Sequence, residues 1–289
     1  MEHRIEPLIA ERAPWLYRSR PGTRIIRSGL HKMLGYKTTV EIAKTFEHAP
    51  PSEIMGTMGA RLAKSVTVSG LGNIPAHGAA LVVANHPTGI ADGIILNHLL
   101  SQARPDAYFF ANSDILRILP QMSSMIAPVE WRIEKRCHAK TRETMAYVRQ
   151  ATNEGRMGVI FPSGRLAKRR GLRLYERPWM ASAAMLARKF DLPVIPVNIQ
   201  ARNSAIFYLF DALHPTLRDI TLFHETLNKS KQPFRVTVGE PISAAALPKN
   251  ADDGIAMLRK ATLALGGKDA PAVNLVEASR PWLKWPQAD

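Results

Sequence analysis

The residues best suited to chemistry in this sequence are a histidine and an aspartate in the segment NHPTGIADG, residues 85–93. The segment follows AALVVA, an apolar run typical of a buried strand. Pro87 and Gly89 favour a tight, local turn between His86 and Asp92. If the turn folds back, the carboxylate accepts a hydrogen bond from one imidazole nitrogen, which leaves the other nitrogen to take a proton. This arrangement predicts a general base.

The same pair also has a purely structural interpretation. Asp92 can cap the helix that follows the turn, with His86 merely filling the turn. Spacing alone does not decide between capping and catalysis. The discriminating observation is whether the two side chains meet.

A second segment, FPSGR, ends another apolar run and is followed by LAKRRG. Ser163 and Gly164 lie in a Pro-x-Gly turn whose backbone N–H groups can face an anion, and Arg165 and Lys168 add positive charge beside it. The segment predicts a site for phosphate or another anionic head group. The alternative interpretation is a solvated basic loop.

The elements that position these residues begin at about residue 66, where β-rich runs start to alternate with helical patterns. The predicted strands are VTVSG, AALVVAN, AYFFAN, MGVIFP and LPVIPVNI. Helices are predicted at 92–100, 141–153 and 178–190, the last with Pro178 at its first position. The alternation predicts an α/β fold with a largely parallel β-sheet flanked by helices. Both candidate segments then follow strands, where open α/β sheets place their sites.

The pattern of the first 65 residues predicts helices interrupted by prolines. We therefore expect an N-terminal helical segment at 1–65, followed by an α/β domain with a C-terminal extension at 66–289. Within residues 24–37, Ile25, Ile26, Leu30, Met33 and Leu34 recur at helical spacing among cations. This amphipathic helix either packs on the main domain with its cations in solvent or lies on anionic lipid.

The net charge of +15 implies a polyanionic partner, either nucleic acid or an anionic membrane surface. Aromatic residues make up only 7%, and no RNP or zinc pattern is present, which disfavours nucleic acid. The longest apolar run, residues 79–84, is too short to span a bilayer, and the N-terminus has no secretory signal. We therefore expect a cytoplasmic protein, peripheral on the inner face of the membrane.

Metal and redox chemistry have little support. Cys137 is the only cysteine, so it can form neither an intrachain disulfide nor a cysteine metal site. The histidines lack metal-ligand spacing. We predict no metal and no cofactor.

Four segments in order resemble the glycerolipid acyltransferase family, which includes the lysophosphatidic acid acyltransferases. They are NHPTGIADG, VIFPSGR, LPVIPV and VTVGEPI. NSAIFY, HPTLRDI and LNKS, in residues 203–230, resemble the bacterial hemolysin-like branch, which includes acyltransferases that make ornithine lipids. Two features depart from the common pattern. Five residues rather than four separate His86 from Asp92, and Ser163 replaces the glutamate of FPEGTR, with Arg165 one place early.

The resemblance implies the glycerolipid acyltransferase fold and a direct acyl transfer. His86 is the base, Asp92 orients it, and backbone N–H groups after His86 stabilise the oxyanion. Arg132, which ends MIAPVEWR, is a further candidate for substrate contact. The implied donor is acyl-CoA or acyl carrier protein, and the acceptor is a lysolipid such as 1-acylglycerol-3-phosphate, with lyso-ornithine lipid as the alternative. A catalytically silent lipid-binding protein and a basic nucleic-acid-binding protein remain the rivals of another class.

Overall fold

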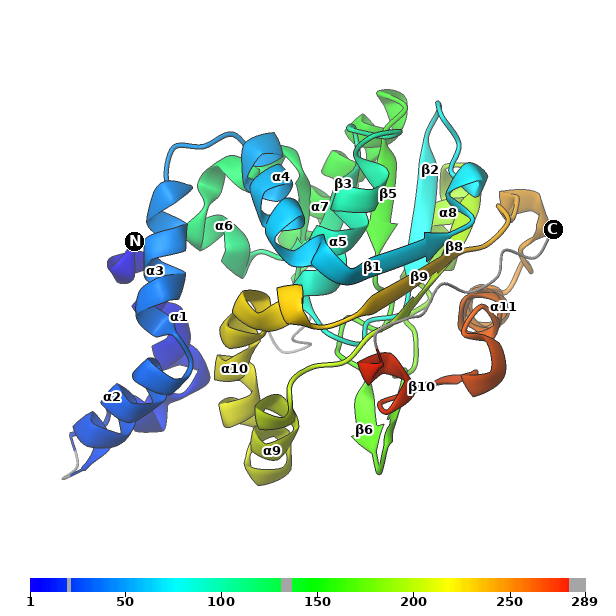
Figure 1. The fold of residues 1–289 in the computed structure, drawn as a ribbon. Helices are drawn as coiled ribbons and strands as arrows, with labels where there is room; N and C mark the ends of the chain where they lie inside the picture. The colour runs from blue at the N-terminus through cyan, green and yellow to red at the C-terminus, as the bar shows by residue number, and fades with distance from the viewer. Residues whose placement is uncertain (20–21, 131–136, 281–289) are drawn as a thin grey trace.

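A computed structural model describes residues 1–19, 22–130 and 137–280, and a seven-stranded sheet forms its centre (Figure 1). The strands in chain order are β1 (Val66–Ser69), β2 (Ala80–Ala84), β3 (Tyr108–Asn112), β4 (Ile126–Val129), β5 (Met157–Ile160), β8 (Val194–Gln200) and β9 (Phe234–Val238). Their order across the sheet is β1-β9-β8-β2-β5-β3-β4. The five predicted strand runs all form strands of this sheet.

The sheet is largely parallel. Strands β8, β2, β5, β3 and β4 run in one direction, and β9 pairs with β8 in the antiparallel sense. β1 pairs in parallel with β9 and so shares its reversed direction. The predicted α/β class with a mostly parallel sheet is therefore confirmed.

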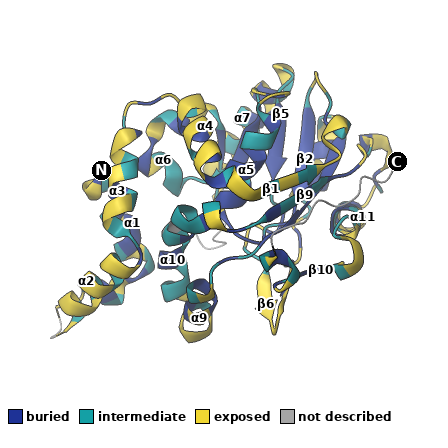
Figure 2. Ribbon diagram, viewed as in Figure 1, coloured by how far each residue is buried: buried dark blue, intermediate teal, exposed yellow. Residues whose placement is uncertain are grey.

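Helices cover both faces of the sheet because the central strands are apolar on both sides. All five residues of β2 are buried. Val82 and Ala84 belong to a core shared with α4 (Pro51–Leu62) and α5 (Ile90–Leu100). Leu81 and Val83 belong to a second core shared with α7 (His138–Asn153), α8 (Ser182–Lys189) and α11 (Ala251–Ala264). In Figure 2 the central strands are dark blue, whereas helices such as α4 also carry exposed residues in yellow.

The N-terminal helices are α1 (Glu2–Arg12), α2 (Thr23–Met33), α3 (Tyr36–Thr45) and α4. Ile5 and Leu8 of α1 belong to the same core as the sheet residues Val82 and Ala84. Arg12 forms an ion pair of 2.9 Å with Asp114 at the start of α6 (Asp114–Ile118). α1 also contacts α10 (Pro215–Asn228).

Two predicted helix boundaries are wrong. The amphipathic helix ends at Met33, because Gly35 has a φ of 70° that breaks helical geometry, and α3 then starts at Tyr36. Helix α8 begins at Ser182, so Pro178 lies outside it. The chain before α8 is tied elsewhere, since the Met180 N–H donates to the carbonyl of Pro162.

A small antiparallel sheet was not predicted. It consists of β10 (Ala272–Asn274), β7 (Arg173–Tyr175) and β6 (Lys168–Arg170), in that order. β6 and β7 form a hairpin that projects from the body of the molecule (Figure 1). Over the residues described, no helix has the length and apolar character needed to cross a membrane.

Candidate active site

The turn that carries His86 is anchored where β2 leaves the sheet. The Asn85 side chain donates to the carbonyl of Ile199 at 2.9 Å and accepts from the Ile199 N–H at 2.7 Å. The amide thus continues the pairing of β2 with β8 by one residue. The carbonyl of His86 accepts the N–H of Ala167 at 2.9 Å. Both ends of the histidine backbone are therefore held by neighbouring strands or loops.

His86 and Asp92 meet across this turn. Imidazole Nδ1 lies 2.9 Å from carboxylate Oδ2, and Asp92 is fully buried. Asp92 also accepts the backbone N–H groups of Thr88 at 2.9 Å and Gly89 at 3.0 Å, and the Thr88 hydroxyl. The Gly89 contact is a capping interaction at the start of α5. Capping and contact with His86 thus occur together rather than as alternatives.

The other imidazole nitrogen is the one available for proton transfer. The Nδ1–Oδ2 contact has ion-pair distance without the alignment of a linear hydrogen bond. No hydrogen bond to Nε2 is present within the described part of the chain, and the side chain is 19% exposed. Phe161 stacks on the imidazole with ring centroids 4.2 Å apart. The imidazole is thus held by Asp92 at its Nδ1 edge and by Phe161 at one face.

Glycine is required at position 89. Its φ is +97°, in the region that side-chain-bearing residues rarely adopt. A Cβ there would also lie 3.2 Å from Cδ2 of Leu166. The turn around His86 and the segment 161–167 therefore fit closely together.

The predicted head-group residues have different environments. Ser163 is buried and donates its hydroxyl to the carbonyl of Arg165 at 2.8 Å, while Gly164 has φ +58° and donates its N–H to Phe161. Arg165 and Lys168 are exposed. Ser163 therefore shapes the turn, and Arg165 and Lys168 are free to face a ligand. Arg132 lies outside the described residues.

Comparison with known proteins agrees with this arrangement. Residues 65–200, which include both segments, match the family model Acyltransferase. Residues 65–200 are therefore similar to the acyltransferase family. The match contains three of the four motifs that carried the predicted resemblance, and VTVGEPI lies beyond it.

Two relatives of the acyltransferase segment are lyso-glycine lipid O-acyltransferases. The chain is 24% identical over 183 residues to the enzyme of Phocaeicola vulgatus. The aligned residues cover 61% of this chain and 64% of that protein. The chain is 23% identical over 183 residues to that of Bacteroides thetaiotaomicron, which covers 61% and 65%. The chain thus spans slightly less than two thirds of the length of these curated relatives.

A solved structure shows the same fold. It is the 1-acyl-sn-glycerophosphate (LPA) acyltransferase PlsC from Thermotoga maritima, with a TM-score of 0.52 and 14% sequence identity. The match covers 86% of this chain and 98% of that structure. The predicted fold of the acyltransferase segment is confirmed.

The expected oxyanion donors after His86 are partly accounted for. The N–H groups of Thr88 and Gly89 donate to Asp92, and Pro87 has no N–H. These three positions therefore do not supply an oxyanion hole in this arrangement. An oxyanion role for the N–H groups further along the turn stays a prediction.

Glu176 is a buried carboxylate that the sequence analysis missed. Its Oε2 accepts the His86 N–H at 3.1 Å, and its Oε1 accepts from Trp179 Nε1 at 3.1 Å. Burial raises its pKa, although the hydrogen bonds from the His86 N–H and Trp179 oppose the rise. Glu176 is the lone acid in a run of cations from 165 to 177, and that contrast was an available signal.

Lys229 is a buried lysine whose charge interacts with that of Asp92. The ammonium of Lys229 donates to the carbonyl of Arg202 and to side-chain oxygens of Asn203, Glu225 and Gln232. Burial lowers the pKa of Lys229, while the charges of Glu225 and Asp92 oppose this. Lys229 lies in the LNKS segment, but its role could not be seen from the sequence.

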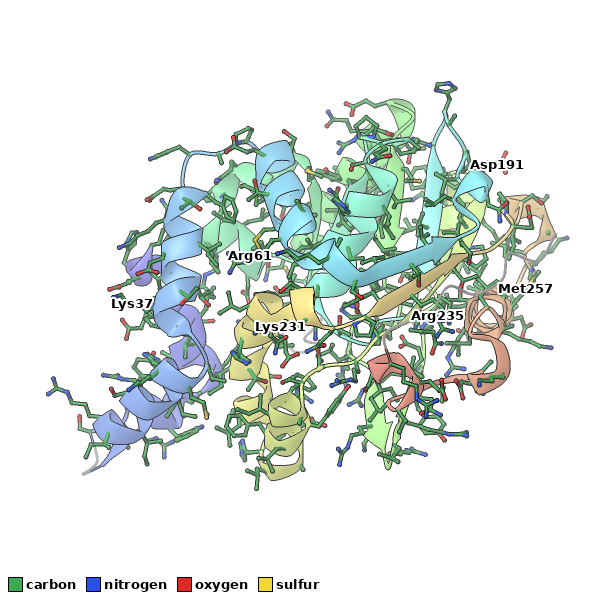
Figure 3. All side chains as sticks on the ribbon, in the orientation of Figure 1. Lys37, Arg61, Asp191, Lys231, Arg235 and Met257 are labelled. Atoms are coloured by element: carbon green, nitrogen blue, oxygen red, sulfur yellow. The ribbon has the colours of Figure 1, made fainter. Side chains whose placement is uncertain are left out.

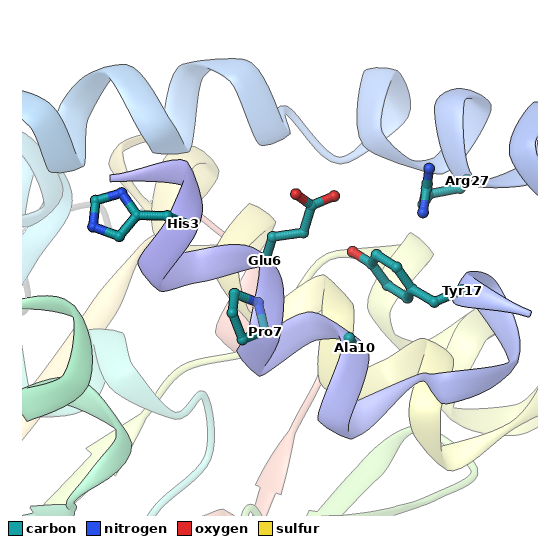
Figure 4. A pocket seen from close by; sticks show the side chains of 6 residues that line it. All are labelled: His3, Glu6, Pro7, Ala10, Tyr17 and Arg27. Carbon is teal, nitrogen blue, oxygen red and sulfur yellow. The ribbon is translucent and has the colours of Figure 1, made fainter.

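A cleft of about 410 Å³ lies between α1 and α2 (Figure 4). Its lining residues come from the N-terminal helices and not from the segments that carry His86 and Arg165. It is lined by His3, Glu6, Pro7, Ala10, Tyr17 and Arg27. The Arg27 guanidinium lies over the Tyr17 ring, 4.7 Å from its centroid. Burial and then the charge of Glu6 raise the pKa of Tyr17. The Arg27–Tyr17 contact therefore links α2 to the 3-10 turn Pro14–Tyr17 that follows α1.

The apolar residues of α2 therefore divide between two environments. Leu30 packs against the main core and Leu34 is buried, whereas Ile25, Ile26 and Met33 are exposed. Leu30 and Leu34 thus fit the packing interpretation, and contact of the exposed side chains with lipid stays a prediction.

Proposed function

We propose that this chain transfers a fatty acyl group from a thioester to the hydroxyl of a lysolipid. The observation that carries the proposal is the His86–Asp92 contact of 2.9 Å, which directs Nδ1 to the carboxylate and leaves Nε2 unpartnered among the described residues. A catalytically silent protein has no need to hold the pair in this way. The acyltransferase family of residues 65–200 and the names of the relatives support the same reaction.

The reaction proceeds in one transfer step through a tetrahedral intermediate. Nε2 takes the proton of the acceptor hydroxyl as its oxygen attacks the thioester carbonyl. Asp92 stabilises the imidazolium that forms. Collapse of the intermediate breaks the carbon–sulfur bond, and the proton passes from Nε2 to the leaving thiolate. Acyl-CoA or acyl carrier protein is the donor and leaves as the free thiol.

The acceptor class follows from the basic turn beside His86. Exposed Arg165 and Lys168 suit an acidic head group, such as the phosphate of 1-acylglycerol-3-phosphate. The departures from FPEGTR and the relatives' action on lyso-glycine lipid favour a second candidate, an amino-acid lysolipid such as lyso-ornithine lipid. Its carboxylate suits the same cations.

Access to a bilayer substrate requires contact with the membrane surface. Ile25, Ile26 and Met33 of α2 are exposed beside Arg24 and Lys32. Further cations, such as Lys37, Arg61 and Lys231, lie on separate elements of the surface (Figure 3). We propose reversible docking of α2 on an anionic membrane surface, since each Lys or Arg near such a surface is worth about 1 kcal/mol.

The test is incubation of the purified protein with acyl-CoA or acyl-loaded carrier protein and a panel of lysolipids. Mass spectrometry of the lipid products identifies the acceptor from one product mass. Thiol release that needs no lysolipid would instead show a thioesterase. No acylated product with any donor and acceptor pair would overturn the proposal.

A further inference from the structure

Helix α9 (Ala205–Leu213) has an apolar face exposed to solvent. Phe207, Tyr208 and Phe210 are buried. The exposed positions are Ala205, Leu209, Ala212 and Leu213, at the spacing of one helix face. Leu209 is 57% exposed and Leu213 64%. A helix at the surface ordinarily presents polar residues to water, so this face needs a partner.

The β6–β7 hairpin is packed against α9. Leu174 of the hairpin shares a small core with Phe207 and Tyr208. The Arg169 guanidinium lies over the Tyr208 ring, 5.5 Å from its centroid. The helix and the hairpin therefore form one structural unit.

The hairpin adds positive charge and one further apolar side chain to this unit. Leu172 at its turn is 65% exposed. Four exposed cations surround it: Lys168, Arg169, Arg170 and Arg173. Apolar side chains flanked by Lys and Arg are the pattern of a segment that rests in a lipid interface.

The same unit touches the turn of His86. Leu166 and Ala167 pack against the core shared by α9 and the hairpin. The Ala167 N–H donates to the His86 carbonyl at 2.9 Å. A surface that contacts lipid here lies next to the candidate base.

We propose that the exposed face of α9 and the tip of the β6–β7 hairpin, together the α9–hairpin surface, dock on an anionic bilayer. The apolar side chains enter the interface and the cations meet lipid head groups. This docking proposal rests on the proposed lysolipid function. It adds a second membrane contact, next to the His86 turn, to the contact proposed for α2. In Figure 1, α2, α9 and the hairpin all reach the lower edge of the molecule, so one membrane plane can meet both surfaces.

The first test measures sedimentation with vesicles of mixed phosphatidylglycerol and phosphatidylcholine. The Leu209→Glu/Leu213→Glu variant should bind about tenfold more weakly or worse, because each buried leucine contributes on that order. Met185→Glu is the matched control, since Met185 is 58% exposed on α8 and lies outside the proposed surface. Leu172→Gln with Arg170→Gln and Arg173→Gln tests the hairpin independently. Thermal unfolding of each variant shows whether it folds, and Leu209→Gln/Leu213→Gln replaces the first variant if it does not.

Vesicle binding requires no turnover, so this result is independent of the proposed reaction. Weaker binding with unchanged turnover of a water-soluble short-chain acceptor supports the α9–hairpin surface. Equal binding of wild type and both variants overturns it. Unchanged vesicle binding with turnover lost only for the carrier-protein donor would assign the surface to that acidic protein instead. A change in sedimentation coefficient with unchanged vesicle binding would assign it to a second copy of the chain.

Discussion

The backbone N–H of His86 donates to the carboxylate of Glu176, 90 residues further along the chain, at 3.1 Å. This bond joins the turn of the candidate base to the segment after the β6–β7 hairpin. A buried carboxylate so placed holds the backbone of His86. Its burial also gives it a measurable signature in the pH dependence of stability.

Replacing Glu176 with Gln should flatten that pH dependence. Burial raises the pKa of Glu176 above its ordinary value of 4.5, so the native state keeps the proton longer than the unfolded state does. The free energy of unfolding therefore falls as pH rises from about 4.5 through the native pKa. The variant carries no such proton and should lose less stability over that range. Urea unfolding at a series of pH values measures this, with exposed Glu240→Gln as the control. Equal slopes for the Glu176 variant and wild type would contradict the assignment.

His86→Ala should lower kcat by about 10²- to 10⁴-fold while the protein stays folded, because it removes the general base. Steady-state turnover with the acceptor found by mass spectrometry measures the loss, and circular dichroism checks the fold. His77→Ala changes an exposed histidine and should have no effect. A folded His86→Ala variant that keeps more than about a tenth of the wild-type kcat would exclude His86 as the base.

Asp92→Asn should lower kcat strongly, since the amide neither stabilises the imidazolium nor selects its tautomer. The corresponding change costs about 10⁴-fold in the serine-protease triad. We also expect a loss of about 1–3 kcal/mol in stability, because a buried acceptor of several hydrogen bonds is altered. Thr88→Val separates the two effects, since it removes the hydroxyl bond to Asp92 and leaves the carboxylate. An unchanged rate in Asp92→Asn would refute the pairing.

Arg165→Ala should raise the KM for the acceptor more than it lowers kcat. A head-group contact made equally in the ground and transition states is uniform binding. Arg165 is exposed, so its removal should leave stability almost unchanged. Arg149→Ala on α7 is a matched control for the loss of one exposed arginine. An unaltered KM for every active lysolipid would place Arg165 outside the site.

Ile25→Glu/Ile26→Glu should weaken sedimentation with anionic vesicles. Both side chains are exposed, so the change tests lipid contact without disturbing the core, unlike a change at Leu30. Binding of the wild type should also fall at high salt, because the Debye length shrinks from about 10 Å at 0.1 M to about 3 Å at 1 M. Equal binding to neutral and anionic vesicles at every salt concentration would contradict the electrostatic part of docking.

Local pattern was enough to predict the strands and to identify His86 and Asp92 as a pair that a tight turn can bring together. A short apolar run such as AALVVA is recognisable as a buried strand from its own residues, without knowledge of distant parts of the chain. The tight turn at Pro87 and Gly89 brings residues six positions apart together for the same local reason. The resemblance to the acyltransferase family was likewise predicted from short motif segments, and residues 65–200 match the model of that family.

Only the tertiary structure decided which distant groups surround the turn. Glu176 and Lys229 acquire their roles through burial against segments far away in the chain, and no local pattern encodes such contacts. The motif also did not show that Asp92 accepts the N–H groups of Thr88 and Gly89, which removes both from the expected oxyanion donors. The apolar residues of α2 divide between core and solvent because hydrophobicity specifies what can be buried. Packing against the rest of the chain decides what is buried.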